Sequence, residues 1–322
     1  MKRKLGVCLA TVLLCSAFFG GCTGGSEKVV FNEYWFKDSN FATNGAETLS
    51  YNVSFEEGSG FGDGKLELDY TGTYTTTLLP NTVYNEQTGV YYYETNLDLD
   101  VTFTVKGETE TKTDAYVKTK AYFKTAKDGL CPLYVFSEYH SYVPNNSATS
   151  LSNAYSETKA TVETVYGANG TSGVCTQTDK LNDKVYKNSF SANSKDAKKY
   201  SCLDVEQLYF ALRGVNSSEN ATPKFLVYSA GNEAYQSVTA SFGSKVVGDT
   251  QFSGVLNSSV DYYPVSVSLN AELSGTNHIV WISAHSNPQQ NANRNVILRM
   301  EANFPYNMGK LIYKLNSASF SN

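Results

Sequence analysis

The chain has few of the residues and none of the short motifs on which most enzymes and metal proteins depend. It carries three histidines and six cysteines in 322 residues, and no two cysteines have the CxxC spacing of a zinc or redox site. No G-x-S-x-G nucleophile elbow is present, and the glycines of residues 58–64 lack the spacing of a phosphate-binding loop. We therefore predict a protein that is not an enzyme, with no catalytic residues, no metal site and no cofactor.

The histidines are His140, His278 and His285, and they do not group into a metal-binding or triad motif. Glu138 and His140 are two residues apart and share one face of a predicted strand, so they could place an acid beside a base. A solvated strand face explains the same pair without catalysis, and we favour that interpretation.

The chain also lacks an excess of basic residues. Its formal charge is −5, and removing residues 1–21 deletes three basic and no acidic residues, which takes the charge to −8. An acidic surface is poorly suited to tracking nucleic-acid phosphates. We expect a monomer that does not bind nucleic acid.

Long apolar runs are absent apart from one at the start. Basic residues 2–4, an apolar run over residues 5–19 and the pair Gly20-Gly21 make a secretory signal. Cys22 follows at once, as in the lipobox of bacterial lipoproteins. We therefore expect a signal peptide over residues 1–21, lipidation of Cys22 with palmitate-type acyl chains, and anchoring to the extracytoplasmic face of a bacterial membrane. Residues 22–46 would form a tether and a first short strand, and residues 47–322 a single domain.

Cysteines are also scarce in the predicted mature chain. With Cys22 used by lipid, Cys131, Cys175 and Cys202 remain. Three thiols allow at most one disulfide, and the sequence does not decide whether it forms.

Aromatic residues, in contrast, are abundant, with 24 tyrosines and 17 phenylalanines, which favours strands over helices. Residues 91–105 alternate between apolar residues at odd positions and polar residues at even positions. This pattern is typical of a strand with one wet face. Fifteen residues span about 50 Å, so the strand must twist and coil with its sheet.

Residues 109–123 continue the alternation and predict the partner of this strand. Directly opposed residues of an antiparallel pair share a face, so regular pairing excludes a two-residue loop between the strands. A three-residue loop with Gly107 in its left-handed position favours Thr104 opposite Glu108. The alternative register sets Lys106 opposite Glu110.

Further alternation predicts strands along most of the chain, without a long linker rich in proline or glycine. We therefore predict an all-β fold, a large curved antiparallel meander or half-barrel with one amphipathic helix on its concave face. The helix is expected over residues 202–213, with Ser201 and Asp204 as a capping box. The other predicted strands cover residues 49–55, 66–70, 133–142, 154–166, 184–192, 224–229, 235–242, 262–273, 278–283, 296–302 and 310–315.

Three local patterns resemble an uncharacterised bacterial family, domain-of-unknown-function family 3108. They are the strand at residues 47–53, the helix at residues 204–213, and the closing strands at residues 279–283, 296–298 and 309–315. Proteins of that family look like the Lol lipoprotein carriers, in which a long antiparallel sheet curls around helices. The resemblance implies a half-barrel that is open to apolar ligands.

The predicted concave face is unusual because Thr, Ala and Val dominate parts of it. Small residues leave volume that either the helix or a ligand must fill. We therefore predict binding of an apolar or amphiphilic ligand. The alternative is a carbohydrate- or protein-binding surface lipoprotein of the cell envelope, because tyrosines can stack on sugars. The candidate lining positions share the apolar face: Leu97, Leu99, Val101, Phe103, Val117 and Phe123.

Overall fold

The structure is a computed structural model, and it describes residues 46–59, 66–126, 129–215, 220–256, 259–269, 278–284, 295–304 and 308–320. The predicted signal peptide, Cys22, the tether with its short strand, and His285 lie outside the described residues.

One sheet of sixteen strands makes up most of the described chain, which confirms the predicted all-β class. The order is β8-β7-β6-β5-β4-β3-β2-β1-β16-β15-β14-β13-β11-β10-β9, with β12 beside β13. Among the described pairs, β9 and β10 alone are parallel. The strands are β1 (Glu47–Glu57), β2 (Glu67–Tyr84), β3 (Gln87–Val105), β4 (Glu108–Ala126), β5 (Gly129–Pro144), β6 (Tyr155–Tyr166), β7 (Ser172–Asp179), β8 (Lys184–Ser191), β9 (Ser201–Asp204), β10 (Lys224–Ser229), β11 (Ala234–Phe242), β12 (Val246–Asp249), β13 (Val260–Leu269), β14 (His278–Ser283), β15 (Ile297–Asn303) and β16 (Gly309–Phe320).

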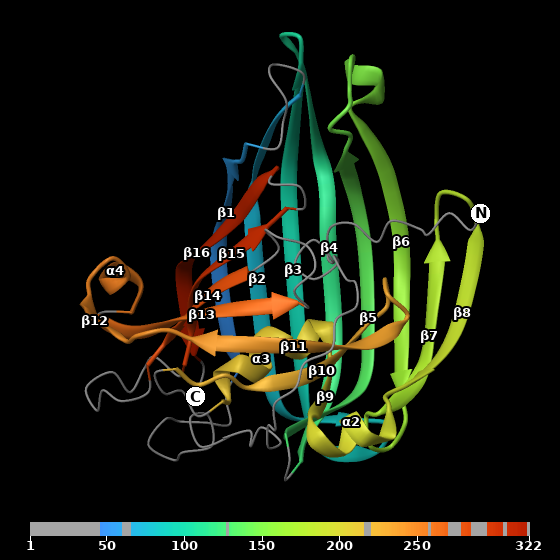
Figure 1. Cartoon of the computed structure of the whole chain (residues 1–322), viewed down its shortest axis with the longest axis vertical. Coiled ribbons are helices and arrows are strands. Elements are labelled where there is room, and N and C mark those ends of the chain that lie inside the picture. The colour runs from blue at the N-terminus through green and yellow to red at the C-terminus, as the bar shows by residue number, and fades with distance from the viewer. Residues whose placement is uncertain are drawn as a thin grey trace.

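The sheet curls over so that its two halves face each other. In Figure 1 the strands β1–β8 stand upright, and the strands β10, β11, β13 and β14 cross in front of them. The terminal strand β9 returns to lie against β5. Within the described residues β8 and β9 do not pair with each other, so the barrel-like sheet stays unclosed.

The strands β2, β3 and β4 have 18, 19 and 19 residues, which is about 60 Å each. Buried and more exposed residues alternate along β3 from Tyr91 to Val105, as the sequence predicts. The odd-numbered residues of β3 therefore define the inner face, and the even-numbered residues define the outer face.

The predicted register of the β3–β4 hairpin is wrong. Val105 pairs with Glu108 across the two-residue loop Lys106-Gly107, whose φ angles are 54° and 82°. Two successive residues with positive φ match the twist of a hairpin, and glycine adopts such a conformation at little cost.

A β-bulge is the reason why the parity argument failed. The pairing changes from Val101 opposite Lys112 to Leu99 opposite Ala115, so β4 has one more residue than β3 in this interval. The extra residue moves the odd positions of β4 from the outer face to the inner face. Thr109 and Thr111 accordingly touch the outward threonines of β3, whereas residues 115–123 keep the predicted inward alternation.

The predicted helix begins later than expected. Residues 201–204 form β9, a 3₁₀ turn η3 follows at Val205–Gln207, and the helix α3 covers Leu208–Arg213. Asp204, not Ser201, is the cap: its side chain accepts from the Glu206 amide at 2.9 Å, while Gln207 accepts from the Asp204 amide at 3.0 Å. Ser201 and its neighbours are extended because they pair with β10.

All six residues of α3 are buried, and the helix lies between the two halves of the sheet. Phe210 is in ring contact with Tyr93 of β3 and Phe123 of β4. On its other side Tyr209 contacts His278 of β14. Three short elements at the periphery, η2 (Leu151–Asn153), α2 (Ser194–Lys199) and α4 (Ser253–Leu256), were not predicted.

Candidate functional site

The six predicted lining positions lie on the inner face of β3 and β4, and all are buried. Their exposed fractions are 0 to 5 %, and they belong to one continuous apolar core. Phe123 packs against Phe210 of the helix, with ring centroids 5.0 Å apart. The helix therefore fills the space over at least this position. The full set is Leu97, Leu99, Val101, Phe103, Val117 and Phe123.

A row of four hydroxyl side chains crosses this apolar face. Thr76 pairs with Thr95, Thr95 with Thr119, and Thr119 with Ser137, so the row runs straight across β2, β3, β4 and β5. All four residues are buried, with exposed fractions of 1 to 7 %. We call Thr76, Thr95, Thr119 and Ser137 the hydroxyl row. The sequence analysis noticed the small residues but did not identify this row.

Apolar residues flank the hydroxyl row on both sides along the strands. On β3 and β4, the pair Tyr93–Ala121 lies on one side of the row, and the pair Leu97–Val117 lies on the other side. Thr119 and Ser137 bond to each other, with their oxygens 3.0 Å apart. The inner face therefore carries one polar band, the hydroxyl row, between two apolar surfaces.

Glu206 faces this band from the η3 turn. Its carboxyl hydrogen-bonds to the Thr119 side chain. The neighbours Val205 and Gln207 are buried, whereas Glu206 keeps part of its surface accessible. Burial first, and the nearby charge of Asp204 second, raise the pKa of Glu206 to about 8. At neutral pH this carboxyl is therefore mostly protonated, and it can both donate and accept hydrogen bonds.

Asp204 forms a second interior carboxyl beside Glu206. The Tyr166 hydroxyl of β6 donates to Asp204 Oδ2 at 2.5 Å. Burial raises the pKa of Asp204 to about 6, although the bonds from Tyr166 and the Glu206 amide oppose the shift. These bonds are structural, because they let Asp204 cap η3 and hold β9 against β6.

Tyrosines surround the other end of the band. Tyr93 is hydrogen-bonded to Tyr74 and to Thr76 of the hydroxyl row. Burial first raises the pKa of Tyr74 well above its usual value, and the charges of Tyr93, Tyr51 and Glu206 add to the shift. Tyr313 of β16 packs on Tyr74 at 5.4 Å. Its hydroxyl is fully buried and has no hydrogen-bond partner among the described residues.

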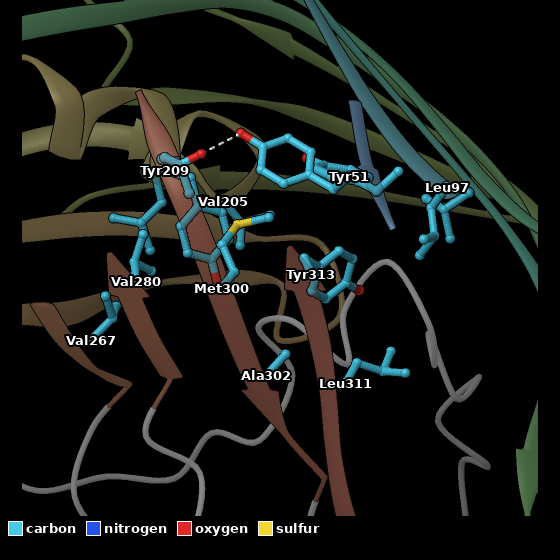
Figure 2. Close-up of a cluster of buried hydrophobic side chains, with 14 of the residues drawn as sticks. Tyr51, Leu97, Val205, Tyr209, Val267, Val280, Met300, Ala302, Leu311 and Tyr313 are labelled. Atoms are coloured by element: carbon cyan, nitrogen blue, oxygen red, sulfur yellow. Dashed lines mark hydrogen bonds between the residues drawn. The ribbon is translucent and has the colours of Figure 1, made fainter. Parts of the chain in front are cut away.

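Figure 2 shows the apolar side chains that close the interior from the other half of the sheet. In this view Val280, Met300 and Tyr313 of β14, β15 and β16 lie below Tyr51 of β1. The Tyr51 hydroxyl donates to the Ile297 carbonyl at 2.9 Å. The interior is therefore bounded by both halves of the sheet.

One buried ion pair ties the helix to the sheet. Arg213 of α3 donates to both carboxylate oxygens of Glu47 on β1, at 2.6 and 2.8 Å. Arg213 Nε also donates to the Asn295 carbonyl at 3.0 Å, and Asn295 Nδ2 donates to the Arg213 carbonyl at 2.7 Å. The two charged side chains are 2 and 3 % exposed. These bonds position α3, and the Glu47 carboxylate neutralises the charge of Arg213.

The described histidines have structural partners. His278 is buried and bonds to the Tyr209 hydroxyl through Nδ1 at 3.1 Å, and burial lowers its pKa to about 4. His140 is also buried, with Asp114 and Glu157 carboxylates 3.3 and 2.8 Å from its two ring nitrogens. Glu138 accepts a hydrogen bond from the Tyr116 hydroxyl at 2.9 Å. The solvated strand face that we favoured from the sequence is wrong for His140, which is only 4 % exposed because the rings of Tyr116 and Tyr142 pack against it.

Within the described part of the chain, no group of three or more potential ligands is arranged to hold a metal ion. No disulfide joins Cys131, Cys175 and Cys202 to one another in the structure. Among the described helices, none has the length and hydropathy to cross a membrane.

No protein-family model matches this sequence, and no curated protein is similar to it. Among solved structures, the chain is similar to one described as a beta-barrel-like protein of domain of unknown function DUF1849 from Brucella abortus. The TM-score is 0.47 at 9 % identity, over 86 % of this chain and 98 % of that chain. The resemblance to family 3108 is not confirmed by these comparisons. The strand order does show a barrel-like sheet.

Proposed function

We propose that this protein is a non-enzymatic, lipid-anchored binding protein on the extracytoplasmic face of a bacterial membrane, and that it holds an amphiphilic ligand inside the curled sheet. The anchor rests on the sequence around Cys22. The local resemblance to family 3108, and through it to lipid carriers, points the same way and stays a prediction.

The observation that carries the proposal is Glu206 beside the hydroxyl row, where apolar residues flank the row on both sides. Burying polar groups costs free energy unless they find hydrogen-bond partners. Apolar side chains in place of Glu206 and the hydroxyl row would stabilise the fold without this cost. Burial is the main cause of the raised pKa of Glu206, yet the residue keeps part of its surface accessible. We infer that its carboxyl borders an enclosed space that water or a polar headgroup enters.

The ligand chemistry follows from these surroundings. A headgroup with hydrogen-bonding oxygens would sit at Glu206 and Thr119, because the protonated acid and the hydroxyl offer both donors and acceptors. Its apolar chain would pack on the predicted lining positions Leu97 and Val117, which lie directly beside the band. Each fully buried methylene of the chain would contribute about 0.8 kcal/mol.

A fluorescent fatty acid titrated into the full chain tests the proposal. Ala121 is fully buried on the inner face between Tyr93 and Val135, so Ala121→Phe should occlude the space and weaken binding with little loss of melting temperature. Thr119→Val should weaken binding while it keeps the shape of the side chain. Thr111→Val, on the outer face of the same strand, is the matched control.

Absence of fatty acid binding by the unaltered chain would refute the proposal. A large drop in melting temperature for Ala121→Phe, without any change in binding, would mean that the inner face is packed core only.

A further inference from the structure

Four tyrosines gather on the outer face, away from the interior described above. Tyr92, Tyr122 and Tyr134 are directly paired across β3, β4 and β5. Tyr84, at the tip of the β2–β3 hairpin, stacks on Tyr122 with centroids 4.6 Å apart and planes 28° apart. The ring centroids of Tyr84 and Tyr134 are 5.7 Å apart. We call Tyr84, Tyr92, Tyr122 and Tyr134 the outer tyrosine cluster.

Irregular backbone brings Tyr84 to this place. The β2–β3 pairing shifts register twice, between Leu79 and Thr82 and again between Thr82 and Tyr84. Bulges bend and twist a hairpin, and this one carries its tip over the outer face of β4 and β5. A regular hairpin would leave Tyr84 beside β3 only.

Carboxylates hold the rings of the cluster in place. The Tyr92 hydroxyl donates to Glu94 Oε2 at 2.9 Å, and the Tyr134 hydroxyl donates to Glu163 Oε1 at 3.1 Å. Burial first, and the Glu163 carboxylate second, raise the pKa of Tyr134 to about 12, so the hydroxyl stays protonated. Each ring is thereby fixed while remaining partly exposed.

A second row beside the rings, the polar row, has charged side chains at three of its four positions. Glu94 pairs with Lys120, Lys120 with Phe136, and Phe136 with Glu163. A carboxylate accepts several hydrogen bonds and an ammonium donates three. The exposed Lys120 and Glu163 therefore present donors and acceptors next to aromatic surface.

We propose that the outer tyrosine cluster binds a saccharide chain. The negative face of an aromatic ring attracts the polarised C–H groups on one side of a pyranose, and the neighbouring Lys120 and Glu163 side chains take its hydroxyls. Neutral sugars suit the mixed charges of the polar row better than a strongly charged polymer. Because the cluster lies on an open sheet face, it fits several residues of an extended glycan. This site is independent of the proposed interior ligand.

The test is retention of the full chain on cellulose, chitin, xylan, starch and purified peptidoglycan, followed by titration with the soluble oligosaccharide of whichever polymer retains it. Tyr84→Ala and Tyr122→Ala should weaken binding at least tenfold. Tyr84→Phe and Tyr122→Phe keep the ring and should bind within about threefold of the unaltered chain. Tyr186→Ala removes a 44 % exposed tyrosine on the distant strand β8 and serves as the control.

The measured binding decides between a saccharide site and a purely structural cluster. Retention that is lost in the alanine variants and kept in the phenylalanine variants supports the proposal. Failure of the unaltered chain to bind any of the five polymers overturns it. So does unchanged binding in Tyr84→Ala together with a lowered melting temperature, because the ring would then only anchor the hairpin tip.

Discussion

Replacing Glu206 by glutamine should change how the stability of this protein depends on pH. Burial raises the pKa of Glu206 from its usual 4.5 to about 8. Below pH 4.5 the acid is neutral in both the folded and unfolded states, so its ionisation does not change the free energy of unfolding. As the pH rises toward 8 the unfolded state ionises and the folded state does not, which favours unfolding. The difference corresponds to roughly 5 kcal/mol once the pH is above 8.

Urea denaturation of the unaltered chain and of Glu206→Gln, at steps from pH 5 to pH 9, measures this effect. Glutamine keeps the size of the side chain and its hydrogen bond to Thr119, and it carries no charge. The unaltered chain should lose several kcal/mol more than the variant over this range. Thr119→Val should steepen the loss, because the Thr119 bond lowers the pKa of Glu206. Parallel curves for the unaltered chain and Glu206→Gln would refute the placement of this carboxyl in the interior.

Three further predictions follow from other contacts. Arg213→Met should destabilise the fold by about 3–5 kcal/mol, because it leaves the Glu47 charge buried and alone, and the double variant with Glu47→Leu should recover much of this in the same urea assay. The raised pKa values of Glu206 and Asp204 favour folding as the pH falls from 6.5 to about 4, and His278 opposes this gain because burial holds its folded pKa at about 4. His278→Gln should therefore increase the gain in stability on acidification by up to about 3 kcal/mol, and an unchanged pH dependence would contradict this prediction. Cys22→Ala should abolish incorporation of labelled palmitate and release the protein from membranes; a variant that still takes up label would disprove the lipoprotein signal.

The strand pattern was predictable from sequence because the sheet has one wet and one dry face. The alternation along residues 91–105 reports burial directly, and each odd position proved buried. The hairpin register was not predictable by the same logic, since parity holds only where both strands are regular. The bulge opposite Asp100 is a single extra residue, and nothing in the pattern of threonines and charges at residues 109–114 marks it.

The start of the helix was not predictable from local sequence, for a different reason. The spacing of Val205, Leu208, Tyr209 and Leu212 correctly identified a buried stripe. Its start was wrong because β10, more than twenty residues later, pairs with β9 and extends residues that would otherwise cap a helix. Tertiary pairing overrides local preference at such a boundary.

The candidate site was predictable only in part. The inward direction of Leu97 and Val117 follows from alternation, and both are buried. The hydroxyl row requires the registers of four strands, and Glu206 reaches it from a turn about ninety residues away in the chain. No local signal in the sequence brings these groups together.

Photo-crosslinking with a diazirine fatty acid is the measurement that bears most directly on interior binding of an amphiphile. The full chain would be irradiated with the labelled acid, digested and mapped by mass spectrometry, with unlabelled fatty acid as competitor. The account predicts competable labels on the inward residues of β3 and β4, Leu97 and Val117 among them. Labels confined to exposed apolar residues such as Val185 and Val247, which are 65 and 69 % exposed, would contradict it.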